Sequence, residues 1–157
     1  MKKYFLPLFL ILISSILAQS NVEEKNREKF DPNKDPFMDL KNAQVEAKRA
    51  NKRIILDVGG EWCIWCHRLD EFIESNEEIK NYLHENFVVV KVNYSEENKN
   101  EKFLSRYSKI EGYPHMFVLN NKGKELHSQN TGLLEKEKSY DAEKIMKFLK
   151  KWSLKKS

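Results

Sequence analysis

The chain has two cysteines, and both lie in one short motif, Cys63-Ile64-Trp65-Cys66. An apolar run and two glycines precede the motif, a pattern typical of a strand that turns closely into a helix. Free N–H groups and the helix dipole in a first helical turn stabilise an anion, so we expect the pKa of Cys63 to lie below the ordinary thiol value of about 8.5. Cys66 follows one helical turn later, on the inward side. This spacing predicts that Cys63 attacks a disulfide and that Cys66 resolves the resulting mixed disulfide.

Two charged residues lie within the apolar strands predicted near this motif, Asp57 and Lys91. A carboxylate beneath the helix start would be desolvated and raised in pKa, and it could then accept the Cys66 proton through water. The competing interpretation is an aspartate that ends its strand in solvent. Lys91 is either a partner for Asp57 or an edge lysine whose stem covers apolar surface. The residues themselves leave both pairs of alternatives open.

The aromatic and histidine residues around the motif bear on its redox direction. No histidine stands between the cysteines, so one cation fewer stabilises the thiolate, and this favours a reductant over a strong oxidant. Trp65 either contacts substrate or packs beside the site. His115 could tune the thiolate or contact substrate, with a half-exposed structural histidine as the alternative.

His67 directly follows the second cysteine, so the sequence also fits the Cys-x-x-Cys-His pattern of c-type haem attachment. In that case His67 would be one axial ligand, and Met116, Met146 or another histidine the second. We favour a redox dithiol, because haem attachment requires neither a preceding buried strand nor the later Gly-Tyr-Pro at 112–114. A zinc site is disfavoured, because only two cysteines are present and the remaining histidines are scattered (His84, His115, His127). We therefore expect no metal.

The first twenty residues have the pattern of a secretory signal. Lys2 and Lys3 precede an apolar run of 14 residues, 4–17, and the small residues Ala18 and Ser20 follow. The run is short of the roughly 20 residues that span a bilayer, so we expect cleavage near Ala18 or Ser20, with an uncleaved anchor as the alternative. Export would place the cysteines in an oxidising setting, where a dithiol is either a stable bond or a working redox pair.

Composition limits the remainder to one soluble domain. The chain has 157 residues, 40% of them hydrophobic, which suffices for a single modest core. Its 28 basic and 24 acidic residues are too evenly mixed to indicate a nucleic-acid partner. Residues 21–36 are strongly charged and are predicted to be a solvated linker, which leaves 37–157 as the folded domain.

Hydrophobic periodicity predicts an alternating order of strands and helices after a leading helix. Strands are expected at 54–58, 87–92, 115–119 and 124–128. Helices are expected at 36–50, 63–75, 75–83, 103–107 and 145–152. Asp35 with Pro36 starts the first helix, and Ser75 with Glu78 forms a capping box for the third. The nearly all-apolar strand at 87–92 is expected to be central. This order predicts an α/β fold, a four-stranded mixed sheet with helices on both faces.

The sequence from Ile54 to Cys66 resembles the active-site strand and helix start of the thioredoxin superfamily. Residues 62–92, followed by Gly-Tyr-Pro at 112–114, are similar to its exported branch, which includes the C-terminal domain of the bacterial transmembrane disulfide reductase. The resemblance covers roughly 37–152. It implies that Pro114 is a cis proline facing the cysteines and that Tyr113 offers backbone bonds to an extended substrate. It also implies that Asp57 is the family's buried acid and Lys91 the lysine near it.

The resemblance implies a periplasmic or secreted thiol-disulfide oxidoreductase of thioredoxin-like fold that needs no cofactor beyond a redox-active Cys63–Cys66 disulfide. Its expected partners are the disulfides of exported proteins and a membrane thiol reductase as electron donor, and we expect a monomer. Alternatives are the c-type cytochrome and a non-catalytic binding module in which the disulfide only stiffens the helix start. The candidate residues are Cys63, Cys66 and Asp57 for catalysis, Trp62, Trp65, Tyr113 and Pro114 for substrate binding, and Lys91, His67 and His115 for tuning.

Overall fold

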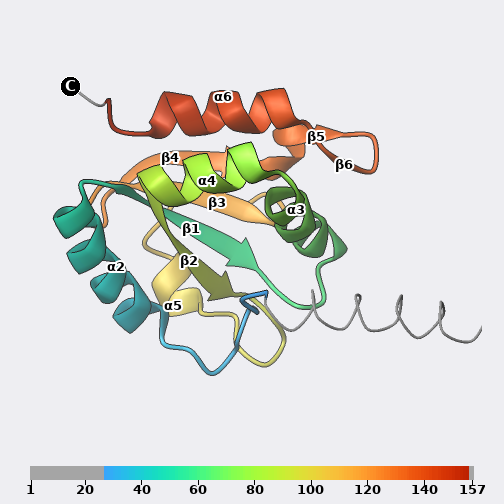
Figure 1. The fold of residues 1–157 in the computed structure, drawn as a ribbon. Helices are drawn as coiled ribbons and strands as arrows, with labels where there is room; N and C mark the ends of the chain where they lie inside the picture. The colour runs from blue at the N-terminus through green and yellow to red at the C-terminus, as the bar shows by residue number, and fades with distance from the viewer. Residues whose placement is uncertain (1–26, 156–157) are drawn as a thin grey trace, which may run out of the picture.

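The computed structural model describes residues 27–155, and the predicted signal at 1–20 lies outside them. A four-stranded mixed sheet forms the centre of the molecule (Figure 1), in the order β2-β1-β3-β4. Strand β1 (Arg53–Gly59) pairs in parallel with β2 (Phe87–Asn93) and antiparallel with β3 (His115–Leu119). Strand β4 (Glu125–Asn130) completes the sheet as the antiparallel partner of β3. The predicted four-stranded mixed sheet is confirmed.

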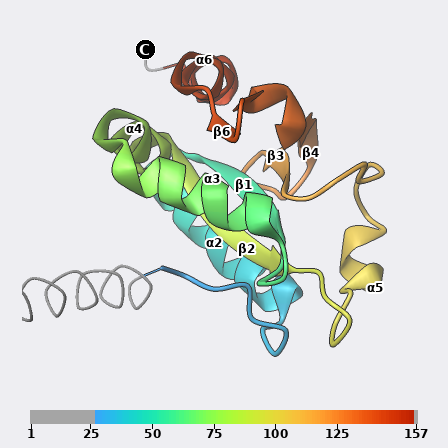
Figure 2. The same ribbon diagram turned by 90° about the vertical axis from the view of Figure 1, so that its right-hand side faces the viewer.

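Helices cover both faces of this sheet, as Figures 1 and 2 show from two directions. Helix α2 (Pro36–Ala50) and the short α5 (Glu101–Leu104) pack on one face. Helices α3 (Ile64–Ser75), α4 (Glu77–Asn86) and α6 (Ala142–Trp152) pack on the other. The predicted α/β arrangement with helices on both faces is therefore confirmed.

Alternate residues of β1 supply two separate cores, because successive side chains of a strand point to opposite faces. Ile54, Leu56 and Val58 join Phe117 in the core beneath α2. Ile55 joins the core beneath α3, α4 and α6. By the same alternation, residues 57 and 59 lie on the α3 face of the sheet.

Strand β2 corrects one prediction, since it is an edge strand and not a central one. Its apolar side chains are covered by helices instead of a second neighbouring strand: α2 packs over one face and α4 over the other. Burial of both faces makes an edge strand as apolar as a central one, so composition alone could not tell them apart.

The helix caps agree with the sequence in one place and differ in another. The Asp35 carboxylate accepts a hydrogen bond from the Phe37 N–H at 2.9 Å, and Pro36 begins α2 as predicted. Helix α4 is capped by Asn76, whose side chain accepts from the Ile79 N–H at 3.1 Å. The predicted Ser75 cap is wrong, because Ser75 is still the last residue of α3.

Three short elements between β4 and α6 have no counterpart in the predicted order. They are a 3-10 turn η1 (Thr131–Leu134) and the two short strands of a hairpin, β5 (Glu135–Lys136) and β6 (Ser139–Tyr140). The hairpin packs on α3. These elements are too short for either hydrophobic period to register in the sequence.

The charged segment at 21–36 is described from Arg27 onward, and this part is not a solvated linker. Phe30 is only 2% exposed, and Arg27 forms ion pairs with Glu61 and Asp70. A single aromatic residue among many charges gave no periodic signal, so the packing of this segment was not predicted. No helix within 27–155 has the length and apolar character needed to cross a membrane.

The buried Phe117 ring provides a test of the core beneath α2. This ring is 0% exposed and stacks on Tyr107, with ring centroids 5.2 Å apart. Phe117→Ala should lower the free energy of unfolding by about 3–5 kcal/mol, because it removes buried apolar area and leaves a cavity. Val45→Ala on the exposed face of α2 is the control, with an expected change within about 0.5 kcal/mol. Denaturant unfolding measures both, and equal effects would contradict this core assignment.

Candidate active site

Cys63 and Cys66 are joined by a disulfide at the start of α3, with their Cα atoms 5.2 Å apart. Cys63 is the N-cap of the helix, and its sulfur accepts a hydrogen bond from the Cys66 N–H at 3.1 Å. This is the position at which unpaired helix N–H groups stabilise a thiolate. Both residues are buried, Cys63 at 4% exposure and Cys66 at 1%. The predicted strand-to-helix setting of the motif is confirmed.

The glycines before the motif allow the helix to approach the sheet. A Cβ atom added at Gly59 would lie 2.5 Å from the Cys66 sulfur and 3.1 Å from Cζ of Phe30. A Cβ at Gly60 would collide with the indole nitrogen of Trp62 and the Tyr94 carbonyl oxygen. The absence of side chains at 59 and 60 therefore seats Cys66 directly against β1.

Asp57 lies two residues before Gly59, on the same face of β1, and is only 6% exposed. The parallel register places it opposite Lys91 on β2, and Lys91 Nζ donates to Asp57 Oδ2 at 3.2 Å. Oδ1 of Asp57 has no hydrogen-bond partner among the described residues. Burial raises the pKa of Asp57, and the nearby Lys91 charge offsets only part of that effect. Asp57 is therefore the buried acid and not an aspartate that ends its strand in solvent. Lys91 is its partner and not a lysine that only covers apolar surface.

Lys91 is shared between two carboxylates, and the second one was missed in the sequence. Its Nζ donates to Asp70 Oδ1 at 2.6 Å, closer than to Asp57. Burial alone would lower the pKa of Lys91, but the two carboxylates together raise it, so this ammonium stays charged. Asp70 follows Cys66 by four residues, and that spacing could have indicated that both lie on one face of α3.

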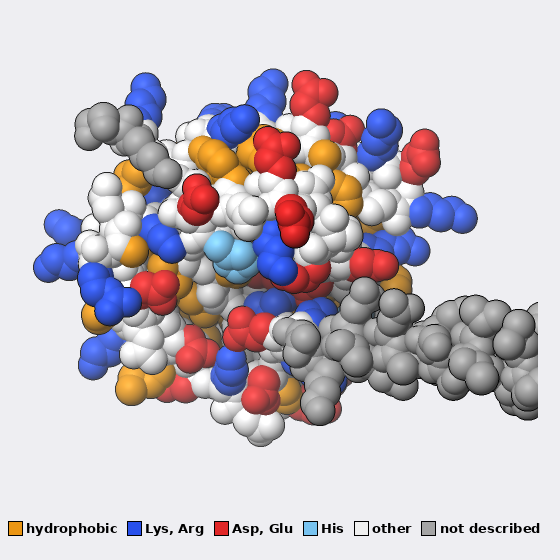
Figure 3. All heavy atoms as spheres, in the orientation of Figure 1, with side chains coloured by type: hydrophobic (Ala, Val, Ile, Leu, Met, Phe, Trp, Pro, Cys, Tyr) orange, Lys and Arg blue, Asp and Glu red, His pale blue; other side chains and the backbone are white. Residues whose placement is uncertain are grey.

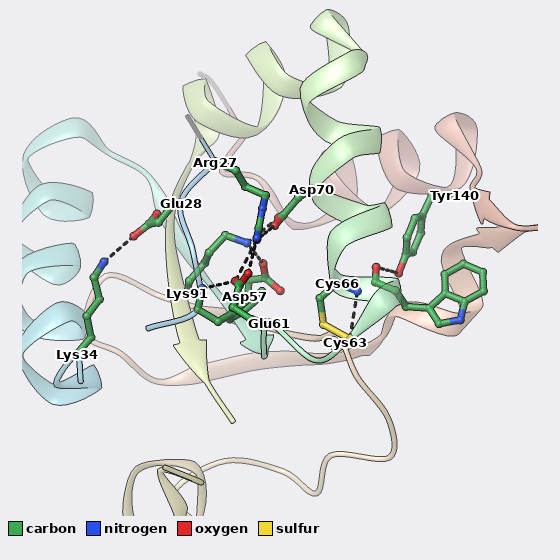
Figure 4. Close-up of polar contacts among 12 residues, drawn as sticks. Arg27, Glu28, Lys34, Asp57, Glu61, Cys63, Cys66, Asp70, Lys91 and Tyr140 are labelled. Carbon is green, nitrogen blue, oxygen red and sulfur yellow. Dashed lines mark hydrogen bonds and ion pairs between the residues drawn. A yellow bond between two sulfur atoms is a disulfide. The ribbon is translucent and has the colours of Figure 1, made fainter. Parts of the chain in front are cut away.

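Arg27 closes this charge network from the N-terminal segment, as Figure 4 shows beside the disulfide. Its guanidinium donates to Asp70 Oδ2 at 3.0 Å and to both carboxylate oxygens of Glu61. Glu61 also accepts from the Phe30 N–H at 2.9 Å. Arg27 has no sequence signal of its own, because its partners are 34 and 43 residues away.

Trp62 and Tyr113 form an aromatic rim next to the disulfide. Trp62 is 60% exposed, and its indole N–H donates to the Tyr94 carbonyl oxygen at 2.7 Å. Tyr113 stacks on Tyr94 at 4.7 Å and meets Trp62 edge to face at 5.7 Å. The Tyr113–Pro114 peptide bond is cis, as the resemblance implies. A groove of about 670 Å³ opens beside this rim, lined by Phe30, Pro32, Glu61, Trp62 and residues 93–97.

Trp65 is half-buried and packs against the β6 hairpin. Its ring meets Tyr140 edge to face at 5.8 Å, and the Tyr140 hydroxyl donates to the Trp65 carbonyl oxygen at 3.3 Å. The Arg68 guanidinium lies over the outer face of the indole, 4.6 Å from its centroid. These contacts match the packing interpretation of Trp65, and Tyr140 was not singled out in the sequence.

The two candidate tuning histidines occupy different settings. A ring nitrogen of His67, Nε2, lies 2.8 Å from the Glu61 carbonyl oxygen. His115 is 2% exposed and bonds Ser128 Oγ through Nε2 at 2.8 Å, so the expected half-exposed position is wrong. Burial lowers the pKa of His115. Its ring faces Phe117, on the sheet face opposite Asp57.

Potential metal ligands do not gather elsewhere in the described region. Within residues 27–155, no three His, Cys, Asp or Glu side chains are grouped as a metal site.

Figure 3 shows acidic and basic side chains interspersed over one face of the molecule.

Comparison with known proteins relates the chain to a single family. The family model for the thioredoxin-like domain matches residues 40–148. Spermatogenesis-associated protein 20 of Rattus norvegicus is 41% identical over 73 residues, 44% of this chain and 9% of that protein. Disulfide bond reductase DsbH of Chlamydia pneumoniae is 27% identical over 93 residues, 54% of this chain and 55% of that protein. The matches thus span about a tenth and about half of these relatives.

Solved structures show the same fold. A disulphide isomerase from Xylella fastidiosa has a TM-score of 0.68 at 25% identity, over 80% of this chain and 97% of that one. The oxidised C-terminal domain of DsbD from Neisseria meningitidis has a TM-score of 0.54 at 17% identity, over 71% and 90% of the two chains.

The raised pKa of Asp57 predicts a stability gain when this residue is made neutral. The pKa of Asp57 in the folded chain lies above its ordinary value of 3.8, so the folded chain keeps the Asp57 proton to a higher pH than the unfolded chain does. Stability is therefore lost as pH rises through the folded pKa. Asp57→Asn should match the wild type near pH 3 and be more stable than the wild type at about pH 7, because Lys91 keeps Asp70 as partner. Denaturant unfolding across pH measures the difference.

Asp141→Asn provides a control of opposite sign. Backbone N–H groups of Lys144 and Glu143 hydrogen-bond to the Asp141 carboxylate and lower its pKa, so its contribution to stability is lost as pH falls. A loss of stability in Asp57→Asn at neutral pH would contradict the assignment of a net cost to the charged Asp57.

Proposed function

This chain belongs to the thioredoxin-like domain family, and on that basis we propose that it is an extracytoplasmic thiol-disulfide oxidoreductase that reduces disulfides of exported proteins. The observation that carries the proposal is a Cys-x-x-Cys disulfide at a helix start that packs against the strand carrying the buried Asp57. The reducing direction is supported by the absence of a histidine between the cysteines and by the similarity to a protein named as a disulfide bond reductase.

The proposed reaction starts from the dithiol form of the chain. The Cys63 thiolate attacks one sulfur of a substrate disulfide, which forms a mixed disulfide and releases a substrate thiolate that takes up a proton. Cys66 then passes its proton through water to the Asp57 carboxylate and attacks the Cys63 sulfur. The second substrate thiolate leaves and is protonated in turn. Two electrons have passed to the substrate, which is now a dithiol, and Cys63–Cys66 is a disulfide.

Substrate would approach across the aromatic rim of Trp62 and Tyr113. Tyr113 packs against the cluster that contains both cysteines and meets Trp62 edge to face, and the groove of about 670 Å³ lies beside Trp62. Their large rigid surfaces bind chains of varied sequence at low entropic cost. Trp65, held on Tyr140, would support the helix start and not the substrate.

Location and electron supply follow from the signal-type segment at 1–20. An exported dithiol is exposed to oxidants and needs a continuing source of electrons. A membrane thiol reductase, working on the outer side of the membrane, would return Cys63–Cys66 to the dithiol form. The cysteine pair would be the whole redox unit, without a bound cofactor.

Trapping tests the division of labour between the cysteines. Cys66→Ala should accumulate covalent complexes with disulfide-bearing proteins, because Cys63 can attack but nothing resolves the product. These complexes should disappear on treatment with a reductant and be absent in Cys63→Ala. Non-reducing electrophoresis after acid quenching measures them. Indistinguishable behaviour of the two variants would overturn the proposed catalysis.

The c-type cytochrome is tested by optical spectroscopy of protein made in a haem-attaching host. The redox dithiol predicts no Soret band and two free thiols after reduction, because Cys63 and Cys66 bond to each other and not to a porphyrin. A stoichiometric Soret band with no titratable thiols would replace the proposed function with electron transfer. Thiol labelling of the same sample gives the matched measurement.

A further inference from the structure

The N-terminal segment reaches into the redox site through Phe30. This ring is 2% exposed and forms a buried cluster with Cys63 and Cys66. Its Cζ atom lies 3.1 Å from the position that a Cβ of Gly59 would take, the same position that the Cys66 sulfur approaches. Phe30 therefore fills the space next to the inner cysteine.

The same ring covers the lysine that pairs with Asp57. Lys91 Nζ lies 4.1 Å from the centroid of the Phe30 ring, a cation–π contact. That Nζ is also 3.2 Å from Asp57 Oδ2. One apolar side chain thus borders both the disulfide and the buried ion pair.

A backbone hydrogen bond and two ion pairs fix the segment around Phe30 to residues before and after the Cys63–Cys66 motif. The Phe30 backbone N–H donates to Glu61, just before the motif, and Arg27 ties the segment to Glu61 and to Asp70 on α3. Arg27 and Phe30 lie ahead of residues 40–148, which the family model matches, whereas Glu61 and Asp70 lie within them. The segment precedes the residues that the family model matches and is secured to the residues that surround the cysteines.

We propose that Phe30 is a positioning residue of the redox centre, whose ring shields one side of the Asp57–Lys91 pair from water and thereby raises the basicity of Asp57 toward the Cys66 thiol. This inference rests on the proposed function, in which Asp57 takes the Cys66 proton as Cys66 attacks the Cys63 sulfur. Phe30 lines the groove beside Trp62, but it has no group that can give or take a proton, so its effect on proton transfer acts through Asp57.

The charges around Asp57 explain why exclusion of water dominates. Lys91 faces it from β2, Asp70 from α3, Arg27 and Glu28 from the N-terminal segment, and Tyr140 from β6. Lys91 is the nearest cation, but it lies closer to Asp70, so its attraction for the Asp57 charge is divided. Burial is consequently the largest influence on the Asp57 proton. A cavity of about 130 Å³ opens onto Asp57 and Lys91 from the side of Arg27 and Glu28, so removal of the Phe30 ring should act mainly by admitting water from a second side.

The direct test is the titration midpoint of the Asp57 carboxyl in Phe30→Ala. Carbon NMR of the reduced full chain should show the midpoint falling by about 1 pH unit toward the ordinary aspartate value. Phe30→Leu should retain most of the wild-type midpoint, because an apolar side chain still excludes water. Phe37→Ala is the matched control, since Phe37 packs on Phe103 on the far face of the sheet and should leave the midpoint unchanged.

A kinetic measurement separates this role from simple packing. The pH at which mixed-disulfide resolution reaches half its maximal rate should fall with the Asp57 midpoint in Phe30→Ala, and the maximal rate should fall by about threefold as the base weakens. In an Asp57→Asn background, Phe30→Ala should no longer move the pH profile. Phe30→Val replaces Phe30→Ala if the latter does not fold, with a smaller shift in the same direction.

An unchanged Asp57 midpoint in a folded Phe30 variant of lowered stability would overturn the inference and reduce Phe30 to a packing residue. A shift in Phe30→Leu as large as that in Phe30→Ala would also overturn it. Failure of the proposed function is a separate outcome, seen as the absence of mixed disulfides in Cys66→Ala, and it leaves the titration result readable.

Discussion

The approach of α3 to β1 at Gly59 is the constraint on which the redox site depends. The Cys66 sulfur comes so near the strand that residue 59 can carry no side chain. This contact buries the inner cysteine and brings the start of the helix over Asp57. Because Asp57 and Gly59 share one face of β1, the carboxylate lies on the face of the sheet that α3 covers. A helix shifted outward would expose both groups to water and remove the electrostatic character of the site.

The buried charges of Arg27, Asp57, Asp70 and Lys91 form one connected network of ion pairs. Lys91 binds two carboxylates, and Arg27 binds the second of them from another segment. Desolvation makes isolated buried charges costly, so each of these groups persists because another neutralises it. Asp57 is the least satisfied member, with one oxygen lacking a partner in the described region. That residual cost gives a carboxylate a reason to take up a proton from a neighbouring thiol.

The residues of the site come from two stretches of the chain. The thioredoxin-like domain supplies the sheet, the cysteines and the cis proline within residues 40–148. Arg27 and Phe30 come from before that region, and both sit against residues beside the motif. The β6 hairpin supports Trp65 through Tyr140 on the other side of the helix start.

The sequence by itself determined the elements whose causes are local. Periodicity predicted the four strands and the main helices, Asp35 and Pro36 predicted the start of α2, and the Cys-x-x-Cys spacing after two glycines predicted the disulfide at a helix start. Only the tertiary structure decided which strand is at the edge, that Lys91 is shared with Asp70, that His115 is buried, and that Arg27 and Phe30 belong to the site. The reason is physical: periodicity and capping act over a few residues, whereas burial and ion pairing depend on contacts between residues tens of positions apart.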